Sequence, residues 1–64
     1  MGLRISAEER QRAIQEMIQK DRRISVNAIC EEFSISEATA RRDLENLEFD
    51  GKIKRVWGGA RALP

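Results

Sequence analysis

Residues 24–47, ISVNAICEEFSISEATARRDLENL, contain two adjacent apolar patterns with the spacing of helices. Apolar residues in the first half of this stretch recur at the spacing of one helix face, and they are Val26, Ile29, Cys30 and Phe33. We therefore expect a short helix over residues 26–33, with Ser25 as its N-terminal cap. A second apolar stripe comprises Ala40, Leu44 and Leu47. It predicts a further helix, which begins at the cap Ser36 and ends at Gly51, a residue type that favours the left-handed conformation.

A tight turn separates these two helices, because only Ser34 and Ile35 lie between them. This layout is that of a helix-turn-helix, which we place at about residues 24–43. In such a motif the second helix enters a DNA major groove, about 12 Å wide, while the first helix braces it. Six apolar residues would lock the two helices together, and they are Ile24, Ile29, Phe33, Ile35, Ala40 and Leu44.

The flanking segments complete a small domain. Ser6 and Glu9 form a capping box that predicts a helix over residues 7–20, and Ile24 indicates a very short strand. Towards the C-terminus, two extended runs at residues 52–57 and 60–63 are joined by Gly58-Gly59, which is typical of a β-hairpin. We predict a mainly α fold with a small β-hairpin: a winged helix-turn-helix in one domain, residues 1–64, with its wing at about 52–63.

The composition favours a binding module over an enzyme. The chain has 64 residues, of which 41% are hydrophobic and 36% charged, with a net charge of +1. A domain this small has no room for a substrate cleft, and it has no histidine to act as a base. From Gly51 onward the chain carries only basic charges, Lys52, Lys54, Arg55 and Arg61, which suits contact with nucleic acid.

The single cysteine and the N-terminus bear on location and cofactors. Cys30 is expected to be a small core residue, since one thiol without histidine makes a poor metal or redox site. We expect no cofactor and a reducing cytoplasm, because neither a secretory signal nor a membrane-spanning apolar run is found. Residues 1–6 match the loose myristoylation pattern, but we interpret Ser6 as the helix cap instead.

Fixing the apolar stripe of the third helix inward assigns its outward face to DNA. Arginine is the commonest reader of guanine, and a small apolar side chain can meet a thymine methyl. The candidates for base contact are Ala38, Thr39, Arg41 and Arg42. Helix caps and the basic wing suit phosphate, and the candidates for backbone contact are Ser25, Ser36, Lys52, Lys54, Arg55, Gly58 and Gly59. The alternative for Arg41 and Arg42 is an ordinary solvated face, and Asp43 is expected to be structural.

Two motifs carry a family resemblance. The pattern S-x-x-T-x-R-R-D-L-x-x-L over residues 36–47, with G-x-x-x-R-V-x-G-G-A over residues 51–60, resembles the DNA-binding domain of DeoR-type regulators. The likeness covers about residues 5–60. It implies a bacterial repressor of a sugar or nucleoside catabolism operon, acting on double-stranded DNA. It also implies a larger C-terminal domain that senses a sugar phosphate and forms homo-oligomers; we expect this chain to be an excised DNA-binding domain, with a natural short protein as the alternative.

Two residues differ from the family pattern, and the pattern does not explain a third. Trp57 stands where histidine is common, and Ala40 replaces a larger β-branched residue. We expect Trp57 to pack in the wing, with contact to sugar and phosphate as the alternative. Phe49 falls on an exposed face, and folding back under the wing is its alternative. A winged helix that binds protein or RNA is the competing function.

Overall fold

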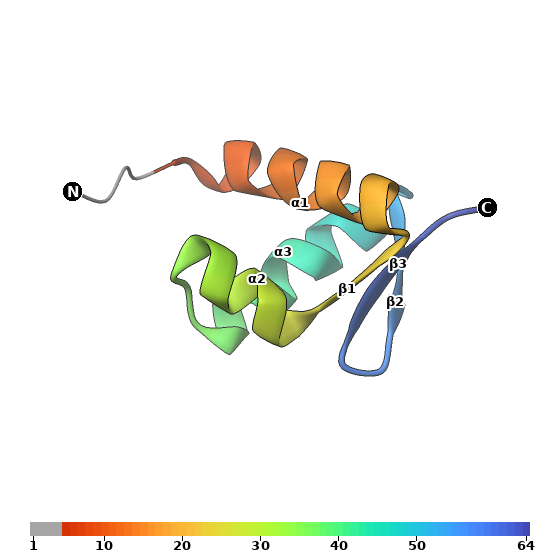
Figure 1. Cartoon of the computed structure of the whole chain (residues 1–64). Helices are drawn as coiled ribbons and strands as arrows, with labels where there is room; N and C mark the ends of the chain where they lie inside the picture. The colour runs from red at the N-terminus through yellow and green to blue at the C-terminus, as the bar shows by residue number, and fades with distance from the viewer. Residues whose placement is uncertain (1–4) are drawn as a thin grey trace.

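The elements of the chain follow the predicted order. A computed structural model describes residues 5–64 and has the order α1 (Ala7–Asp21), β1 (Arg23–Ser25), α2 (Val26–Phe33), α3 (Glu37–Phe49), β2 (Ile53–Val56) and β3 (Gly59–Ala62) (Figure 1). The winged helix-turn-helix is confirmed, with α2 and α3 as the motif and β2 and β3 as the wing. Most of the myristoylation pattern, residues 1–4, lies outside the described residues.

Each helix begins at a serine cap, as predicted. The Ser6 hydroxyl accepts from the Glu9 amide at 3.1 Å, and the Glu9 carboxylate accepts from the Ser6 amide at 3.5 Å. Ser25 accepts from the Ala28 amide at 3.1 Å and Ser36 from the Thr39 amide at 3.2 Å. These bonds satisfy amides that have no partner inside the helix, so the short side chain of serine fixes where each helix starts.

The strands form a three-stranded antiparallel sheet in the order β1-β3-β2. The very short strand predicted at Ile24 is therefore present, and it extends the wing by pairing with β3. The prediction of a Gly58-Gly59 turn is wrong by one residue, because the two residues between the strands are Trp57 and Gly58. Gly58 has φ +78°, which suits glycine in a tight hairpin.

Gly59 has a different task from the one predicted, since it opens β3 and is buried there. A Cβ atom at this position would lie 2.0 Å from the carbonyl oxygen of Ile24 in β1. Only a residue without a side chain allows β1 to approach this closely. The second glycine of the pair is therefore required by the sheet and not by the turn.

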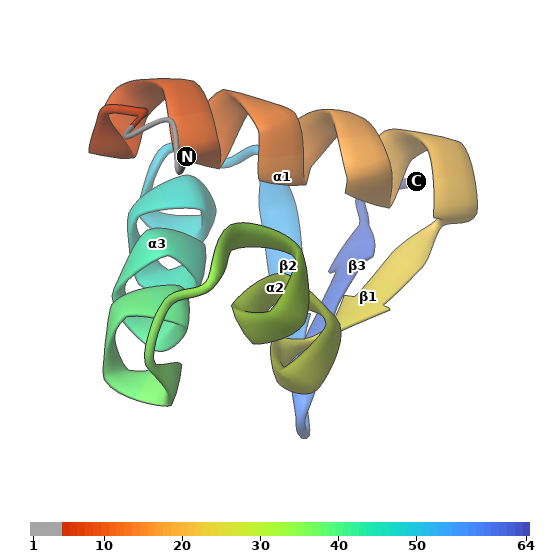
Figure 2. The same ribbon diagram turned by 60° about the vertical axis from the view of Figure 1, so that its left-hand side comes forward.

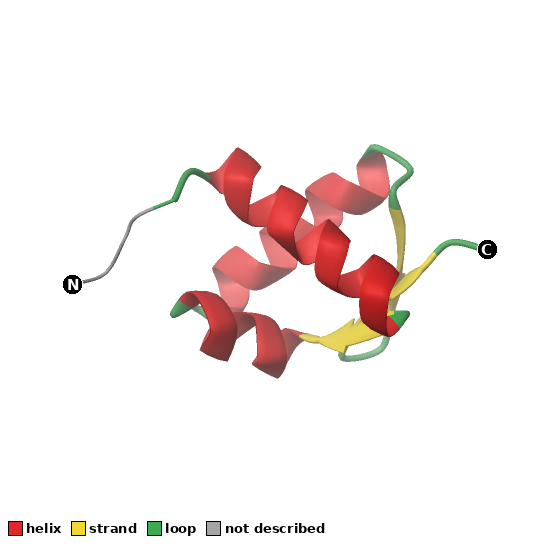
Figure 3. Ribbon diagram, turned by 45° about the horizontal axis from the view of Figure 1, so that its top comes forward, coloured by secondary structure: helices red, strands yellow, loops and turns green. Residues whose placement is uncertain are grey.

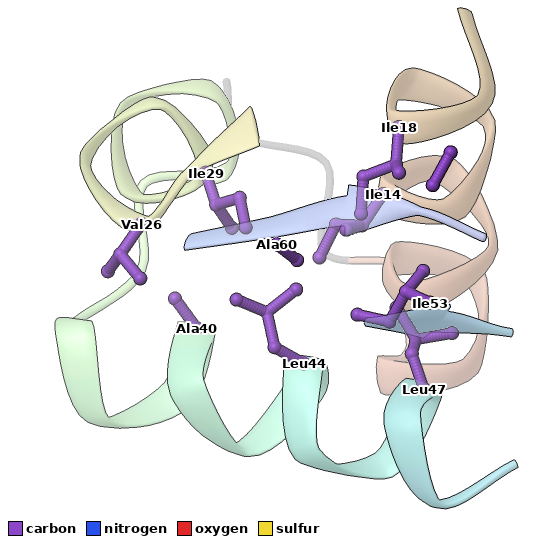
Figure 4. Close-up of a cluster of buried hydrophobic side chains, with 10 residues drawn as sticks. Ile14, Ile18, Val26, Ile29, Ala40, Leu44, Leu47, Ile53 and Ala60 are labelled. Carbon is purple, nitrogen blue, oxygen red and sulfur yellow. The ribbon is translucent and has the colours of Figure 1, made fainter. Parts of the chain in front are cut away.

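The core lies where all three helices meet the inner face of the sheet (Figures 2 and 3). Ala40, Leu44 and Leu47 of α3 point into it, as predicted, and none is more than 3% exposed (Figure 4). The rest of the buried cluster comprises Ile14, Ile18, Val26, Ile29, Ile53, Ala60 and Ala62. Ile24, Cys30, Phe33 and Ile35 pack against its rim, so Cys30 lies against the core as expected but is only partly buried.

Asp43 is the one buried charged residue of the described chain, at 2% exposure. Its carboxylate accepts from Nε and Nη2 of Arg10, the latter at 3.0 Å, and from Nε2 of Gln11 at 3.0 Å. The hydrogen bond with Asp43 raises the pKa of Arg10 above its ordinary value. Burial acts in the opposite direction, and the attraction between the two charges adds to the rise. The structural role predicted for Asp43 is confirmed: it ties α3 to α1.

Two aromatic side chains lie on the surface. Trp57 at the wing tip is fully exposed, so the expectation that it packs inside the wing is wrong. The turn carries it beyond the last strand pair, where no core exists to receive it. Phe49, in the last turn of α3, is 91% exposed, as expected from its position on the outward face of the helix. It does not fold under the wing.

Candidate nucleic-acid interface

The outward face of α3 carries the side chains proposed to read DNA. Ala38, Arg41 and Arg42 are exposed, while Thr39 is half-buried on the flank of the helix. The Thr39 hydroxyl accepts from the Ser36 hydroxyl at 3.1 Å, so these two residues belong to one capping network. This geometry follows from the inward stripe, because residues one or two positions from Ala40 lie on other sides of the helix.

The two arginines of α3 differ in their partners. Nη2 of Arg41 lies 3.6 Å from Oε1 of Glu37, one turn earlier, and both side chains are about 60% exposed. An exposed pair of this kind contributes about 0.3–0.5 kcal/mol, so a DNA acceptor can displace Glu37 at little cost. Arg42 forms no ion pair with any residue of the described chain, 5–64. Its guanidinium is the one on this face that is already free.

The wing is fastened to α3 through Arg55. Glu48 accepts from the Arg55 amide at 3.2 Å, and Oε2 of Glu45 accepts from its Nη1 at 3.4 Å. Nε of Arg55 is shielded from solvent and has no hydrogen-bond partner within residues 5–64. The side chain therefore lies against α3, and it would have to leave Glu45 before it met a phosphate.

The wing tip is held beside the start of α2. The Val26 amide donates to the Gly58 carbonyl at 2.9 Å, which brings the tip close to the cap Ser25. An open groove runs between α2, α3 and the wing, and its lining includes Ser25, Asn27, Glu37, Arg41, Arg55 and Trp57. The structure thus brings together the starts of α2 and α3 and the tip of the wing on one side of the molecule (Figure 2).

Other predicted contact residues lie elsewhere. Lys52 is at the root of the wing, in a hollow shared with Gln11 and Arg12 of α1. Lys54 is exposed and next to Arg55, so the two side chains point to opposite faces of the sheet. Asn27 lines the groove but was missed from the sequence, since a lone asparagine after a helix cap carries no pattern that marks it.

Comparison with known proteins agrees with this geometry. The model of the DeoR-like helix-turn-helix domain matches residues 10–63. The chain belongs to this family. It therefore carries the DNA-binding domain of a DeoR-type transcription regulator, as the two motifs predicted.

Relatives of this DeoR-like chain are named as repressors or regulators. It is 46% identical over 50 residues to a lactose phosphotransferase system repressor of Lactococcus lactis, covering 78% of this chain and 20% of that protein. It is 40% identical over 55 residues to the transcriptional repressor AccR of Agrobacterium fabrum, covering 86% and 21%. It is 38% identical over 55 residues to the regulator UlaR of Escherichia coli, covering 86% and 22%.

The chain spans about a fifth of the length of these curated relatives. No solved structure gives a significant match. In the part of the chain that the structure describes, no helix is long and apolar enough to cross a bilayer.

Proposed function

We propose that this DeoR-like domain binds double-stranded DNA in a sequence-specific manner, with α3 in the major groove. The observation that carries the proposal is the exposed face of α3, where Arg41 and Arg42 stand beside Ala38 and Thr39. Arginine binds guanine through two hydrogen bonds, and the alanine methyl fits against thymine. Arg42, which has no acid to displace within residues 5–64, is the first reader, and Arg41 follows once Glu37 is released.

Backbone contacts come from the residues around the groove. Ser25 and Ser36 start α2 and α3, so phosphates next to them would meet the positive ends of two helices. Gly58 at the wing tip supplies a further contact in the groove. Lys54, on the outer face of the wing, and Lys52, at its root, lie outside the groove and would meet phosphates beyond it. Arg55 joins them only after exchanging Glu45 for a phosphate, and Gly59 contributes through the shape of the sheet, because it is buried.

The regulated process follows from the family and its relatives. We infer that the domain serves a cytoplasmic repressor, and not an enzyme, that controls a sugar or nucleoside catabolism operon. The relatives named above include a lactose phosphotransferase system repressor, which supports a link to sugar metabolism. In the longer protein, a further domain would bind a sugar phosphate and hold several copies together. Two DNA-binding heads on one duplex would then act with a high effective concentration.

Selection of preferred sites from a pool of random duplexes tests the proposal. We expect the wild-type domain to recover a defined motif, and its binding constant to fall steeply as salt rises. Arg42→Ala and Arg41→Ala should each lose about 1–3 kcal/mol of binding free energy at one base pair of that motif. Lys54→Ala should weaken binding to duplexes of the same length alike, whatever their sequence, because a phosphate contact carries no sequence information.

Two outcomes would contradict this function. If both arginine variants recover the wild-type motif with wild-type affinity, α3 does not read the bases. If the wild-type domain binds duplexes without any salt dependence, the double-stranded DNA function itself fails, and binding to RNA or protein becomes the better account.

A further inference from the structure

The sheet places three basic residues in one row. Arg61 in β3 lies directly opposite Arg23 in β1 on one side and Lys54 in β2 on the other. All three residues are exposed. Residues directly opposite in an antiparallel pair share a face, with their Cβ atoms about 4.5–5.5 Å apart. The row therefore crosses all three strands on the side of the sheet that faces away from Arg55 and α3.

No acid of the described chain neutralises this row. Within residues 5–64, none of the three residues forms an ion pair or a side-chain hydrogen bond with a carboxylate. Asp21 lines the same hollow as Arg23 but makes no ion pair with it, and the sequence has no acid after Asp50. Like charges directly opposite each other destabilise a sheet. Such an arrangement becomes favourable when an anion lies against it.

The position of the row relative to the wing tip indicates which anion. Lys54 is three residues before Trp57, which corresponds to about 10 Å along a strand. With α3 in the major groove, we place the wing tip, which lies beside the start of α2, at the neighbouring minor groove. A minor groove is about 7.5 Å deep, so phosphates then rise on both sides of the tip. Lysine and arginine side chains are long enough to span the remaining distance. The outer face of the sheet would then lie beside the strand that flanks the bases read by α3.

We propose that Arg23, Arg61 and Lys54 form a phosphate-binding row that holds the duplex outside the base-read site. The proposal rests on the function proposed above and extends it, because Arg23 and Arg61 belong to neither α3 nor the turn of the wing. The row uses all three strands, and so it gives the pairing of β1 with the wing a role in binding. It contributes affinity for DNA but no preference for sequence.

Salt titrations of single and combined variants test the row. The probes are the duplex recovered from the random pool, with ten extra base pairs on each side, and the same duplex trimmed to the preferred bases. For Arg23→Gln and Arg61→Gln on the long duplex, we expect the slope of log K against log salt to fall by about 0.9 per lost phosphate contact. The variant with all three residues changed should lose about three times as much. On the trimmed duplex these losses should vanish.

A matched control is Arg12→Gln, which removes an exposed positive charge from α1 and should leave the slope on the long duplex close to that of the wild type. The row is overturned if Arg61→Gln keeps the wild-type slope on the long duplex, or if Arg12→Gln lowers it equally. An equal loss on long and trimmed duplexes would overturn the flanking position. If the wild-type domain has no slope on either duplex, the DNA-binding function fails together with the row. A normal slope with an intact motif in the variants rejects the row alone.

Discussion

For single residues, the roles of Asp43 and Gly59 depend on contacts with residues far away in the sequence. Asp43 directly follows the two exposed arginines Arg41 and Arg42, yet it is buried against Arg10 of α1. Gly59 follows a glycine that suits a turn, yet its missing side chain makes room for Ile24. The sequence predicts a structural role for Asp43, but it cannot name Arg10, because the contact spans 33 residues. Long-range contacts of this kind determine which of two neighbouring glycines forms the turn and which one lies against β1.

Replacing Asp43 should destabilise the domain more than breaking an exposed ion pair does. Asp43→Asn removes the charge that Arg10 needs, and a buried pair that loses one partner costs about 3–5 kcal/mol. A domain this small has only about 5 kcal/mol to lose, so we expect partial unfolding at room temperature. Urea denaturation measures the difference. The control Glu37→Gln, which breaks the exposed pair with Arg41, should cost less than about 1 kcal/mol. Equal costs for the two variants would refute the buried tie between α3 and α1.

The two glycines of the wing should respond differently to alanine. Gly59→Ala places a Cβ 2.0 Å from the Ile24 carbonyl, so β1 must move away, and we expect a loss of at least about 1–3 kcal/mol. Gly58→Ala meets no atom within 4 Å and is strained only by its φ of +78°, which costs about 1–2 kcal/mol. Thermal denaturation compares stability, and hydrogen exchange of the Ala62 amide, which donates to the Arg22 carbonyl beside β1, reports on β1 pairing. Faster exchange in Gly58→Ala than in Gly59→Ala would contradict these roles.

At the scale of elements, local chemistry predicts helices well and the wing less well. The serine caps and apolar stripes predict α2 at its observed bounds, Val26–Phe33, because both signals lie within the helix itself. The turn of the wing is misplaced because a glycine at the second central position of a turn is present in both Trp57-Gly58 and Gly58-Gly59. What selects the first is the pairing of β3 with β1, more than thirty residues away. The exposed position of Trp57 follows from the same shift.

The contact between the wing and α3 should restrain DNA binding. Glu45 holds Arg55 at 3.4 Å, and its carboxylate faces the side on which we place the duplex. Glu45→Gln removes one negative charge and frees Arg55, so we expect tighter binding to all duplexes and a slope against log salt that is steeper by about one contact. The control Glu16→Gln removes the same charge from the exposed face of α1 and should change binding much less. Weaker binding by Glu45→Gln, or an equal gain in both variants, would contradict this restraint.

At the scale of the whole molecule, the fold turns a balanced composition into a polarised surface. The net charge is only +1, yet six basic residues lie on α3 and the three strands, namely Arg23, Arg41, Arg42, Lys54, Arg55 and Arg61. Among the acids near them, Asp43 is buried, and Glu45 and Glu48 are engaged with Arg55. The sequence predicts this polarity for the wing, where no acid occurs after Asp50. It does not predict the row across the sheet, because Arg23 and Arg61 are 38 positions apart and only the strand register joins them. The fold therefore does two things: it exposes the outward face of α3, and it gathers basic residues on the sheet.

Titration of the ¹⁵N-labelled domain with the duplex recovered from the random pool shows which face of the domain meets DNA. The outward face of α3 should enter the major groove, so we expect the largest amide shift changes in the first two turns of α3, at the start of α2 and at Trp57-Gly58. The exposed side of α1 should change little. Large changes confined to α1, with α3 unaffected at saturating duplex, would contradict the account.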